Sequence, residues 1–155
     1  MDMHTYAEKV EAIRPKLYRT ALCYLGSQSM AIDVLDEAIY KGLRGAGKLR
    51  QPEFFETWIT RILINECHRE QRRSKRFLPL EDGPELAAEH LDSLPLKEAL
   101  VRLPKDLKDV IILRFFAGHT QGETAKILEI PQGTVATRQR RALQLLRLDL
   151  EEANT

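Results

Sequence analysis

Polar and basic side chains are concentrated on one segment near the C-terminus. After Pro131 the chain reads QGTVATRQRRALQLLR, in which arginine, threonine and glutamine surround a few apolar residues. Guanidinium, amide and hydroxyl groups bind DNA phosphates and the edges of DNA bases. DNA binding is therefore the chemistry that this segment could perform.

A helix must position these side chains. Val135, Ala142 and Leu146 are spaced seven and four residues apart, as on the buried stripe of an α-helix. Recognition helices contact bases with their N-terminal residues, and later cations meet phosphates. We expect base contacts from Gln132, Thr134, Thr137 and Arg138, and phosphate contacts from Arg140 and Arg141. Periodicity alone leaves open a basic face that is merely solvated.

A shorter helix precedes this one. Thr120 and Glu123 have the spacing of a capping box, and Ala125 and Leu128 then face inward. Pro131 separates the two helices, because proline cannot continue a helix and disfavours helical geometry in the residue before it. Two helices joined by a short turn, the second one basic, are typical of a helix-turn-helix.

A second polar face is predicted on a helix over about 53–75. Phe55, Ile59, Ile62 and Leu63 form its apolar side. A different face carries polar residues at steps of three and four, and the end of the helix is basic. The candidate DNA contacts on this face and in the basic end are Arg61, Asn65, His68, Arg69, Arg72 and Arg73. Such a strip suits single-stranded DNA, although cations also complement a helix C-terminus. Trp58 is expected in the core rather than stacked on a base.

Two helices are predicted before this one, over 3–25 and 29–43. Pro15 would kink the first helix or divide it. On the second, Ile32, Leu35 and Ile39 are expected to face inward, with Ala38 beside them, while the acidic residues Asp33, Asp36 and Glu37 lie on the surface. A basic, glycine-containing loop at 45–51 then presents Lys48 and Arg50.

The charge distribution indicates two domains and a linker. Residues 1–76 hold 14 Lys/Arg against 10 Asp/Glu, a net charge of +4. Residues 77–94 hold five acidic residues and no basic one, and residues 95–155 hold 10 basic against 8 acidic residues. We expect an all-α protein of two small helical domains, 1–76 and 95–155, with an acidic linker at 77–94.

The motif LPKDLKDVIILRFFAG followed by TAKILEIPQGTVATRQRRAL resembles the promoter-binding C-terminal domain of extracytoplasmic-function (ECF) sigma factors, in the sigma-70 family. The chain departs from the pattern at Gly122, Ala136 and Gln139. The resemblance implies that the helix after Pro131 reads the −35 promoter element. It also implies that the acidic linker threads the nucleic-acid channel of RNA polymerase.

The N-terminal half carries the same resemblance. MAIDVLDEAIYKGL is similar to the helix with which sigma factors grip the polymerase clamp, which assigns Asp33, Asp36 and Glu37 to polymerase binding. W-I-x-R-I-x-x-N, residues 58–65, resembles the helix that opens and reads the −10 element. The loop at 45–51 would hold a flipped base. The partners implied are RNA polymerase core, promoter DNA and an anti-sigma factor.

Other classes of protein fit less well. No nucleophile–base pair or metal-ligand set recurs at helical spacing, so we expect no enzyme, cofactor or metal. No apolar run approaches a membrane span, and the start lacks a signal-peptide core, so a cytoplasmic protein is expected. Cys23 and Cys67 are expected to be reduced and buried. The alternative function is a free-standing helix-turn-helix repressor or activator, which would have no use for the second DNA-reading strip.

The segment LKDVIILRFFAG is more apolar than a small helical domain needs. It runs from Leu107 to Gly118, and we expect Gly118 to end its helix. Part of the apolar surface is therefore expected to face a partner, either the polymerase flap or an inhibitory protein.

Overall fold

The computed structural model describes residues 1–74 and 94–153, and over these residues the regular elements are all helical. The predicted all-α class is confirmed. Most of the predicted linker lies outside the described residues. The elements are α1 (Met3–Leu25), α2 (Gln28–Gly45), η1 (Ala46–Lys48), η2 (Pro52–Phe54), α3 (Phe55–Ser74), α5 (Leu94–Arg102), α6 (Lys105–Ile111), η3 (Ile112–Phe116), α7 (Gln121–Leu128) and α8 (Gln132–Ala153).

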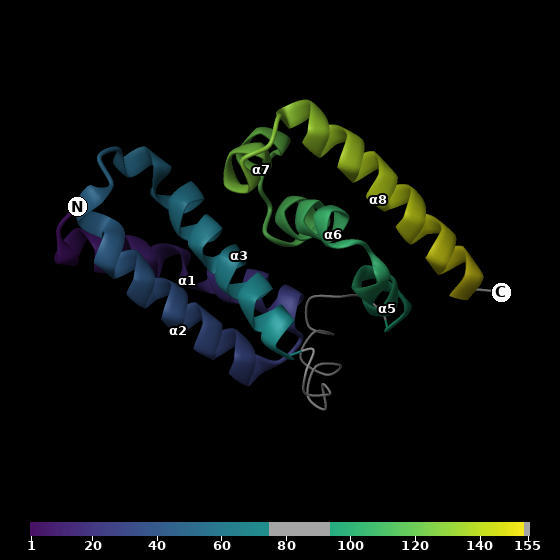
Figure 1. The fold of residues 1–155 in the computed structure, drawn as a ribbon, viewed down its shortest axis with the longest axis horizontal. Coiled ribbons are helices and arrows are strands. Elements are labelled where there is room, and N and C mark those ends of the chain that lie inside the picture. The colour runs from purple at the N-terminus through teal and green to yellow at the C-terminus, as the bar shows by residue number, and fades with distance from the viewer. Residues whose placement is uncertain (75–93, 154–155) are drawn as a thin grey trace.

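The first three α-helices form a bundle in which each packs on the other two (Figure 1). Asp2 caps α1 by accepting from the backbone N–H of Thr5, and Gly26 ends it with a left-handed φ of 69°. The helix runs without a break through Pro15. The predicted helix over 3–25 is confirmed, and the division that Pro15 made possible does not occur; the buried stripe of α1 continues on both sides of the proline, from Val10 to Leu17.

The buried face of α2 agrees with the prediction at Leu35 and Ala38 but not at Ile32. Ala31, Val34, Leu35 and Ala38 are buried, whereas Ile32 is 43% exposed. Both sets of residues fit helical spacing in this apolar segment, so periodicity did not distinguish them. The alanines Ala31 and Ala38 lie on the buried side, and Ile32 faces outward.

The C-terminal helices pack around α8. Helices α5, α6 and α7 all contact it, and a core of Leu100, Leu107, Ala142 and Leu146 lies between α5, α6 and α8. Helix α6 continues into a π-helical turn, η3, in which the N–H of Ala117 donates to the carbonyl of Ile112. Gly118 then has a φ of 78°, as expected of the residue that ends this segment.

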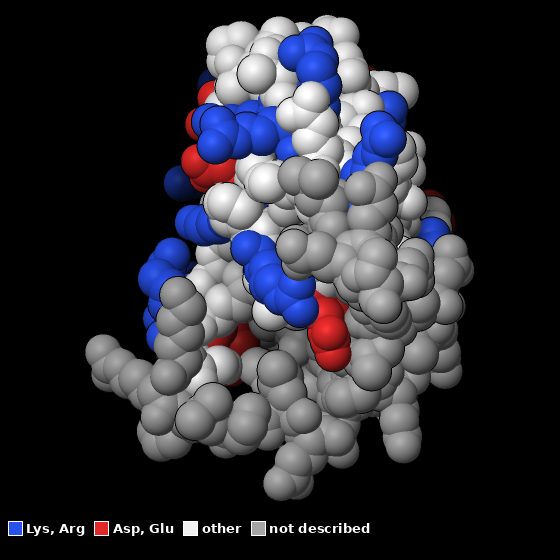
Figure 2. Space-filling model, turned by 90° about the vertical axis from the view of Figure 1, so that its right-hand side faces the viewer, with Lys and Arg blue, Asp and Glu red and all other residues white. Residues whose placement is uncertain are grey.

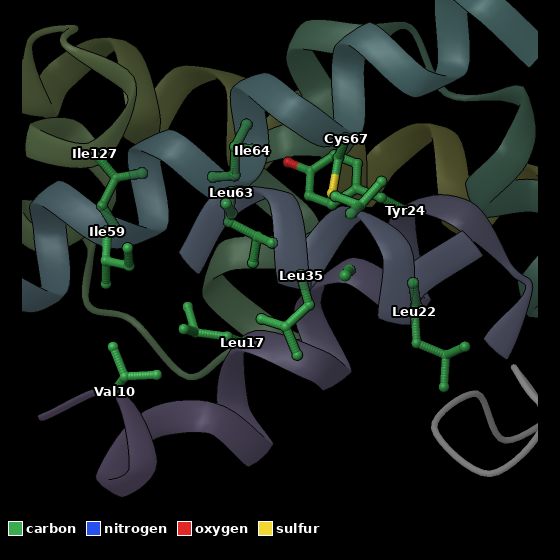
Figure 3. Packing of buried hydrophobic residues seen from close by; sticks show 14 of the residues in the cluster. Val10, Leu17, Leu22, Tyr24, Leu35, Ile59, Leu63, Ile64, Cys67 and Ile127 are labelled. Carbon is green, nitrogen blue, oxygen red and sulfur yellow. The ribbon is translucent and has the colours of Figure 1, made fainter. Parts of the chain in front are cut away.

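The hydrophobic core of the bundle extends into the C-terminal half of the chain. Ile112, Leu113 and Ile127 are at most 2% exposed and belong to the same apolar cluster as the core residues of α1, α2 and α3. Figure 3 shows Ile127 beside Ile59 of α3. Ile112 and Leu113 of η3 thus pack against the chain's own N-terminal bundle, whereas Phe115 is 50% exposed, so a partner for part of this apolar run stays a prediction.

Candidate nucleic-acid interface

Helix α8 has the orientation that its sequence predicts. Val135 and Ala142 are fully buried and Leu146 is 6% exposed, so the predicted stripe is confirmed. The candidate DNA contacts lie outside this stripe: Gln132, Thr137, Arg140 and Arg141 are exposed, and Thr134 and Arg138 are half-buried. Figure 2 shows more Lys and Arg than Asp and Glu on this side of the molecule.

The turn before α8 is built by local hydrogen bonds. The side chain of Thr120 accepts from the N–H of Glu123 at 3.1 Å, and the Glu123 carboxylate accepts from the N–H of Thr120 at 2.8 Å. This is the predicted capping box, and these hydrogen bonds lower the pKa of Glu123. Helix α7 ends at Glu129, which adopts a left-handed φ of 59°. Pro131 then leads into α8, so α7 and α8 form the helix-turn-helix.

A polar network fixes α8 against the rest of its domain. The Nε atom of Arg114 donates to Oε1 of Gln139 at 3.0 Å, and its Nη1 donates to the carbonyl of His119 at 2.6 Å. Gln121 of α7 donates to the same Gln139 oxygen at 3.2 Å. Gln139 departs from the family pattern, and the structure gives it a role in orienting the recognition helix.

The candidate DNA contacts of α3 fall into two groups. Asn65, Arg69, Arg72 and Arg73 are exposed, and they remain open to a nucleic acid. Arg61 and His68 instead contact the C-terminal domain. The predicted polar face therefore exists, but in this conformation part of it lies against α6 and α7.

Arg61 contacts the end of α7. Its Nε donates to the carbonyl of Ile127 at 3.2 Å and its Nη2 to the carbonyl of Lys126 at 2.5 Å. The same Nε lies 3.0 Å from a carboxylate oxygen of Glu129. These carbonyls belong to the last turn of α7, where the helix dipole attracts a cation.

His68 belongs to a buried polar cluster. Oδ1 of Asp109, on α6, accepts from Nε2 of His68 at 2.8 Å and from the hydroxyl of Tyr24 at 2.6 Å. The side chains of His68 and Asp109 are 11% and 8% exposed. Burial, and then the Asp109 charge, raise the pKa of Tyr24 well above its usual value. One signal for this cluster is present in the sequence: Asp109 begins the apolar run DVIIL, and an acid that is buried with such a run needs a polar partner.

The loop between α2 and α3 carries the remaining cations. Lys48, in η1, and Arg50 are both exposed. Phe54 follows in η2, is 40% exposed, and has Nζ of Lys126 5.7 Å from its ring centre. Trp58 packs against the core, as expected, at a ring distance of 6.1 Å from Phe55.

The acidic residues of α2 face solvent. Asp33, Asp36 and Glu37 are exposed, and Tyr40 on the same helix is 56% exposed. Acidic and apolar groups together suit a protein partner better than they suit DNA, whose phosphates repel carboxylates.

The two thiols are free, and Cys67 is completely buried while Cys23 is partly exposed. Burial raises the pKa of Cys23 to about 12. Among the described residues no group of three or more acidic, histidine or cysteine side chains could hold a metal ion. Over the same residues, no helix combines the length and the apolar character needed to cross a bilayer.

Comparisons with known proteins agree with this organisation. The family model for region 2 of sigma-70 matches residues 10–77, and the model for region 4 of sigma-70 matches residues 99–148. The chain is 35% identical to the RNA polymerase sigma factor SigV of Bacillus subtilis (strain 168), over 86% of this chain and 83% of that protein. It is 31% identical to the ECF RNA polymerase sigma-E factor of Escherichia coli (strain K12), over 74% of this chain and 70% of the relative.

Solved structures share the fold. CnrH, solved in complex with the cytosolic domain of CnrY, matches with a TM-score of 0.77 at 21% identity, over 99% of this chain and 92% of CnrH. The sigma factor RpoE of Bartonella quintana, solved with the anti-sigma factor NepR, matches with a TM-score of 0.75 at 22% identity, over 95% of this chain and 97% of RpoE. The two family models, the relatives and the two basic helices agree, and the chain belongs to the ECF group of the sigma-70 family of RNA polymerase sigma factors.

Proposed function

We propose that the chain directs RNA polymerase core to promoters by contacting DNA at two places. Helix α8 reads the −35 element, and α3 with the loop at 45–51 reads and opens the −10 element. The observation that carries this proposal is the pair of basic helical faces in one chain, on α3 and α8. A free-standing repressor needs only the second of them.

The residues divide by role. On α8, Gln132, Thr134, Thr137 and Arg138 contact base edges, and Arg140 and Arg141 contact phosphates. The −10 element is contacted by Lys48, Arg50, Arg61, Asn65, His68, Arg69, Arg72 and Arg73. Successive cations suit the phosphates of an opened strand, and amide or imidazole groups suit its exposed bases.

The acidic face of α2 binds the polymerase. Asp33, Asp36 and Glu37 are solvent-exposed and therefore available to a basic partner surface. An anti-sigma factor would control the binding of this chain to the polymerase. The complex of the sigma factor RpoE with the anti-sigma factor NepR is a precedent for such a partner. These partners place the site of action in the cytoplasm, where the polymerase meets its DNA.

Binding measured with and without core polymerase tests the proposal. The chain alone should bind promoter DNA weakly, because joining both DNA contacts on one polymerase raises the effective concentration of the second contact. Replacing Asp33 and Asp36 by Asn and Glu37 by Gln should weaken core binding. A charge-matched control replaces three exposed acids, Glu8 and Glu11 of α1 and Glu98 of α5, by Gln and should leave core binding unchanged. Equal sequence-specific affinity in the presence and absence of core would contradict the proposal.

A further inference from the structure

Under the proposed function, Arg61 and His68 each have two binding partners, the promoter strand and the C-terminal domain of the same chain. Both are assigned to the −10 element, yet both are bonded to the C-terminal domain in this structure. We propose that the chain inhibits itself: the C-terminal domain engages Arg61 and His68, part of the −10-reading face of α3, and this contact must open before the promoter strand can bind across the whole face. This inference rests on the proposed function of α3.

The contacts of Arg61 compete with DNA. Its guanidinium donates through Nε and Nη2 to two carbonyls at the end of α7 and pairs with Glu129. Because the five N–H groups have a fixed, planar arrangement, a phosphate or a base that binds this edge of the guanidinium must displace α7. The docked α7 therefore reduces the capacity of Arg61 to bind the promoter strand.

Asp109 fixes the position of the covering domain. Its carboxylate comes from α6, but the two side chains that donate to it, Tyr24 and His68, come from α1 and α3. A buried carboxylate is costly without such donors, so a shift of the C-terminal domain along the bundle would leave it uncompensated. The cluster thus selects one docked position, and it holds His68 away from DNA.

Apolar burial makes this position favourable. Ile112, Leu113 and Ile127 are almost completely buried, and they belong to the apolar cluster centred on the N-terminal bundle. Separation of the domains would expose them to water, which is unfavourable in proportion to the apolar area. A partner that opens the chain must compensate for this loss, and polymerase core can do so only by binding the open form more tightly.

The closed form should weaken DNA binding by a predictable amount. When only a fraction of molecules is open, the apparent affinity falls by that fraction. Variants that loosen the contact without touching a DNA-binding residue should therefore bind the −10 strand more tightly. Asp109→Ala removes the acceptor of the buried cluster, and Tyr24→Phe removes one of its two hydrogen bonds while keeping the ring.

The experiment uses the full chain without polymerase. Small-angle X-ray scattering reports the radius of gyration, and fluorescence anisotropy reports binding of a labelled non-template −10 strand from a mapped promoter. Asp109→Ala should expand the chain and bind the strand about tenfold or more tightly, and Tyr24→Phe should change both quantities in the same direction by less. Glu8→Ala removes an equally negative but exposed charge and should change neither.

Three outcomes are decisive. Unchanged scattering and unchanged strand affinity in both Asp109→Ala and Tyr24→Phe would overturn the proposal. Expansion of Asp109→Ala with no gain in strand binding would overturn the inhibitory role. Arg61→Ala should expand the chain without a gain in affinity, because this arginine also contacts DNA. Promoter opening by polymerase with the wild-type chain is measured in parallel, so a failed closed state and a failed promoter function can be told apart.

Discussion

Nη2 of Arg138 on α8 lies 4.0 Å from Oδ2 of Asp106 on α6. The Asp106 side chain is 68% exposed, so this ion pair is weak. It holds Arg138 near the edge of the buried face, but it can break when Arg138 binds another group. Arg141 is exposed, and no ion pair joins it to the described part of the chain. The two arginines are therefore neighbours on the surface of α8 that differ in their surroundings: Arg138 is half-buried beside Asp106, and Arg141 is open to solvent.

This difference predicts different DNA-binding phenotypes. Arg138→Ala should relax the −35 sequence preference by about 1–3 kcal/mol at one base pair, because a base contact discriminates between sequences. Arg141→Ala should weaken binding equally on all sequences and reduce its salt dependence, as expected for a phosphate contact. Titration of a panel of −35 variants at several salt concentrations separates the two effects. Exchange of the two phenotypes would show that the DNA-facing side of α8 is assigned wrongly.

The burial of His119 predicts a pH dependence of the stability of the folded chain. It is 2% exposed, and Lys16 of α1, Glu56 of α3 and Glu123 of α7 act on its charge. Burial, and then Lys16, lower the pKa of His119, whereas Glu56 and Glu123 raise it. The neutral imidazole is thus the form that fits the folded chain. Its contribution to stability is complete above the ordinary pKa of about 6.5 and decreases as the pH falls below that value.

Chemical denaturation between pH 7.5 and 5 tests this. The free energy of unfolding should fall more steeply with acidification in the wild type than in His119→Gln, which cannot gain the proton. His4, which is exposed on α1, provides the control, and His4→Gln should keep the wild-type slope. Parallel curves for the wild type and His119→Gln would refute the assignment.

Gly42 marks the closest approach inside the N-terminal bundle. A Cβ added there would lie 2.5 Å from the Tyr6 hydroxyl oxygen and 2.6 Å from Cδ1 of Ile59. Gly42→Ala should therefore lower the free energy of unfolding by about 1–3 kcal/mol through overpacking. At Gly47 no described atom lies within 4 Å of an added Cβ, so Gly47→Ala should change stability by less than about 0.5 kcal/mol. Equal effects of the two substitutions in thermal or chemical unfolding would contradict this packing.

Glu129 occupies a backbone conformation that favours glycine. Its φ of 59° ends α7 within the helix-turn-helix, and its carboxylate pairs with Arg61. Glu129→Gly and Glu129→Ala both remove the ion pair, so their difference isolates the backbone. The glycine variant should be more stable than the alanine variant by about 1 kcal/mol. Equal stabilities in urea denaturation would show that the turn relaxes out of the left-handed region.

Local features of the fold could be predicted from the sequence. The capping box at Thr120 and the buried stripe through Val135 depend on residues a few positions apart, and both are confirmed. The relationship between the two halves could not be predicted in this way. Asp109 meets Tyr24 and His68 across long stretches of sequence, and periodicity carries no information about such pairs. The same limit applies to Arg61, whose face was predicted but whose protein contact was not.

Ile32 shows a second limit. Helix α2 has apolar residues on more than one side, and the alanines that permit close packing are weak signals in a hydrophobic pattern. The side chain that turned out to be exposed lies beside the acidic residues assigned to the polymerase. An apolar residue on a surface helix can therefore belong to an interaction site instead of the core, and helical periodicity alone does not distinguish the two cases.

Transcription of fragmented host genomic DNA by purified core polymerase, with and without this chain, tests the central claim most directly. Mapping of RNA 5′ ends should reveal start sites that require the chain and share a −35 and a −10 sequence at a fixed spacing. Thymines in the −10 element of these sites should become reactive to permanganate only when the chain and core are both present. Identical start sites with core alone, or site-specific DNA binding by the chain without any new start site, would contradict the assignment of this protein as a promoter-opening sigma factor.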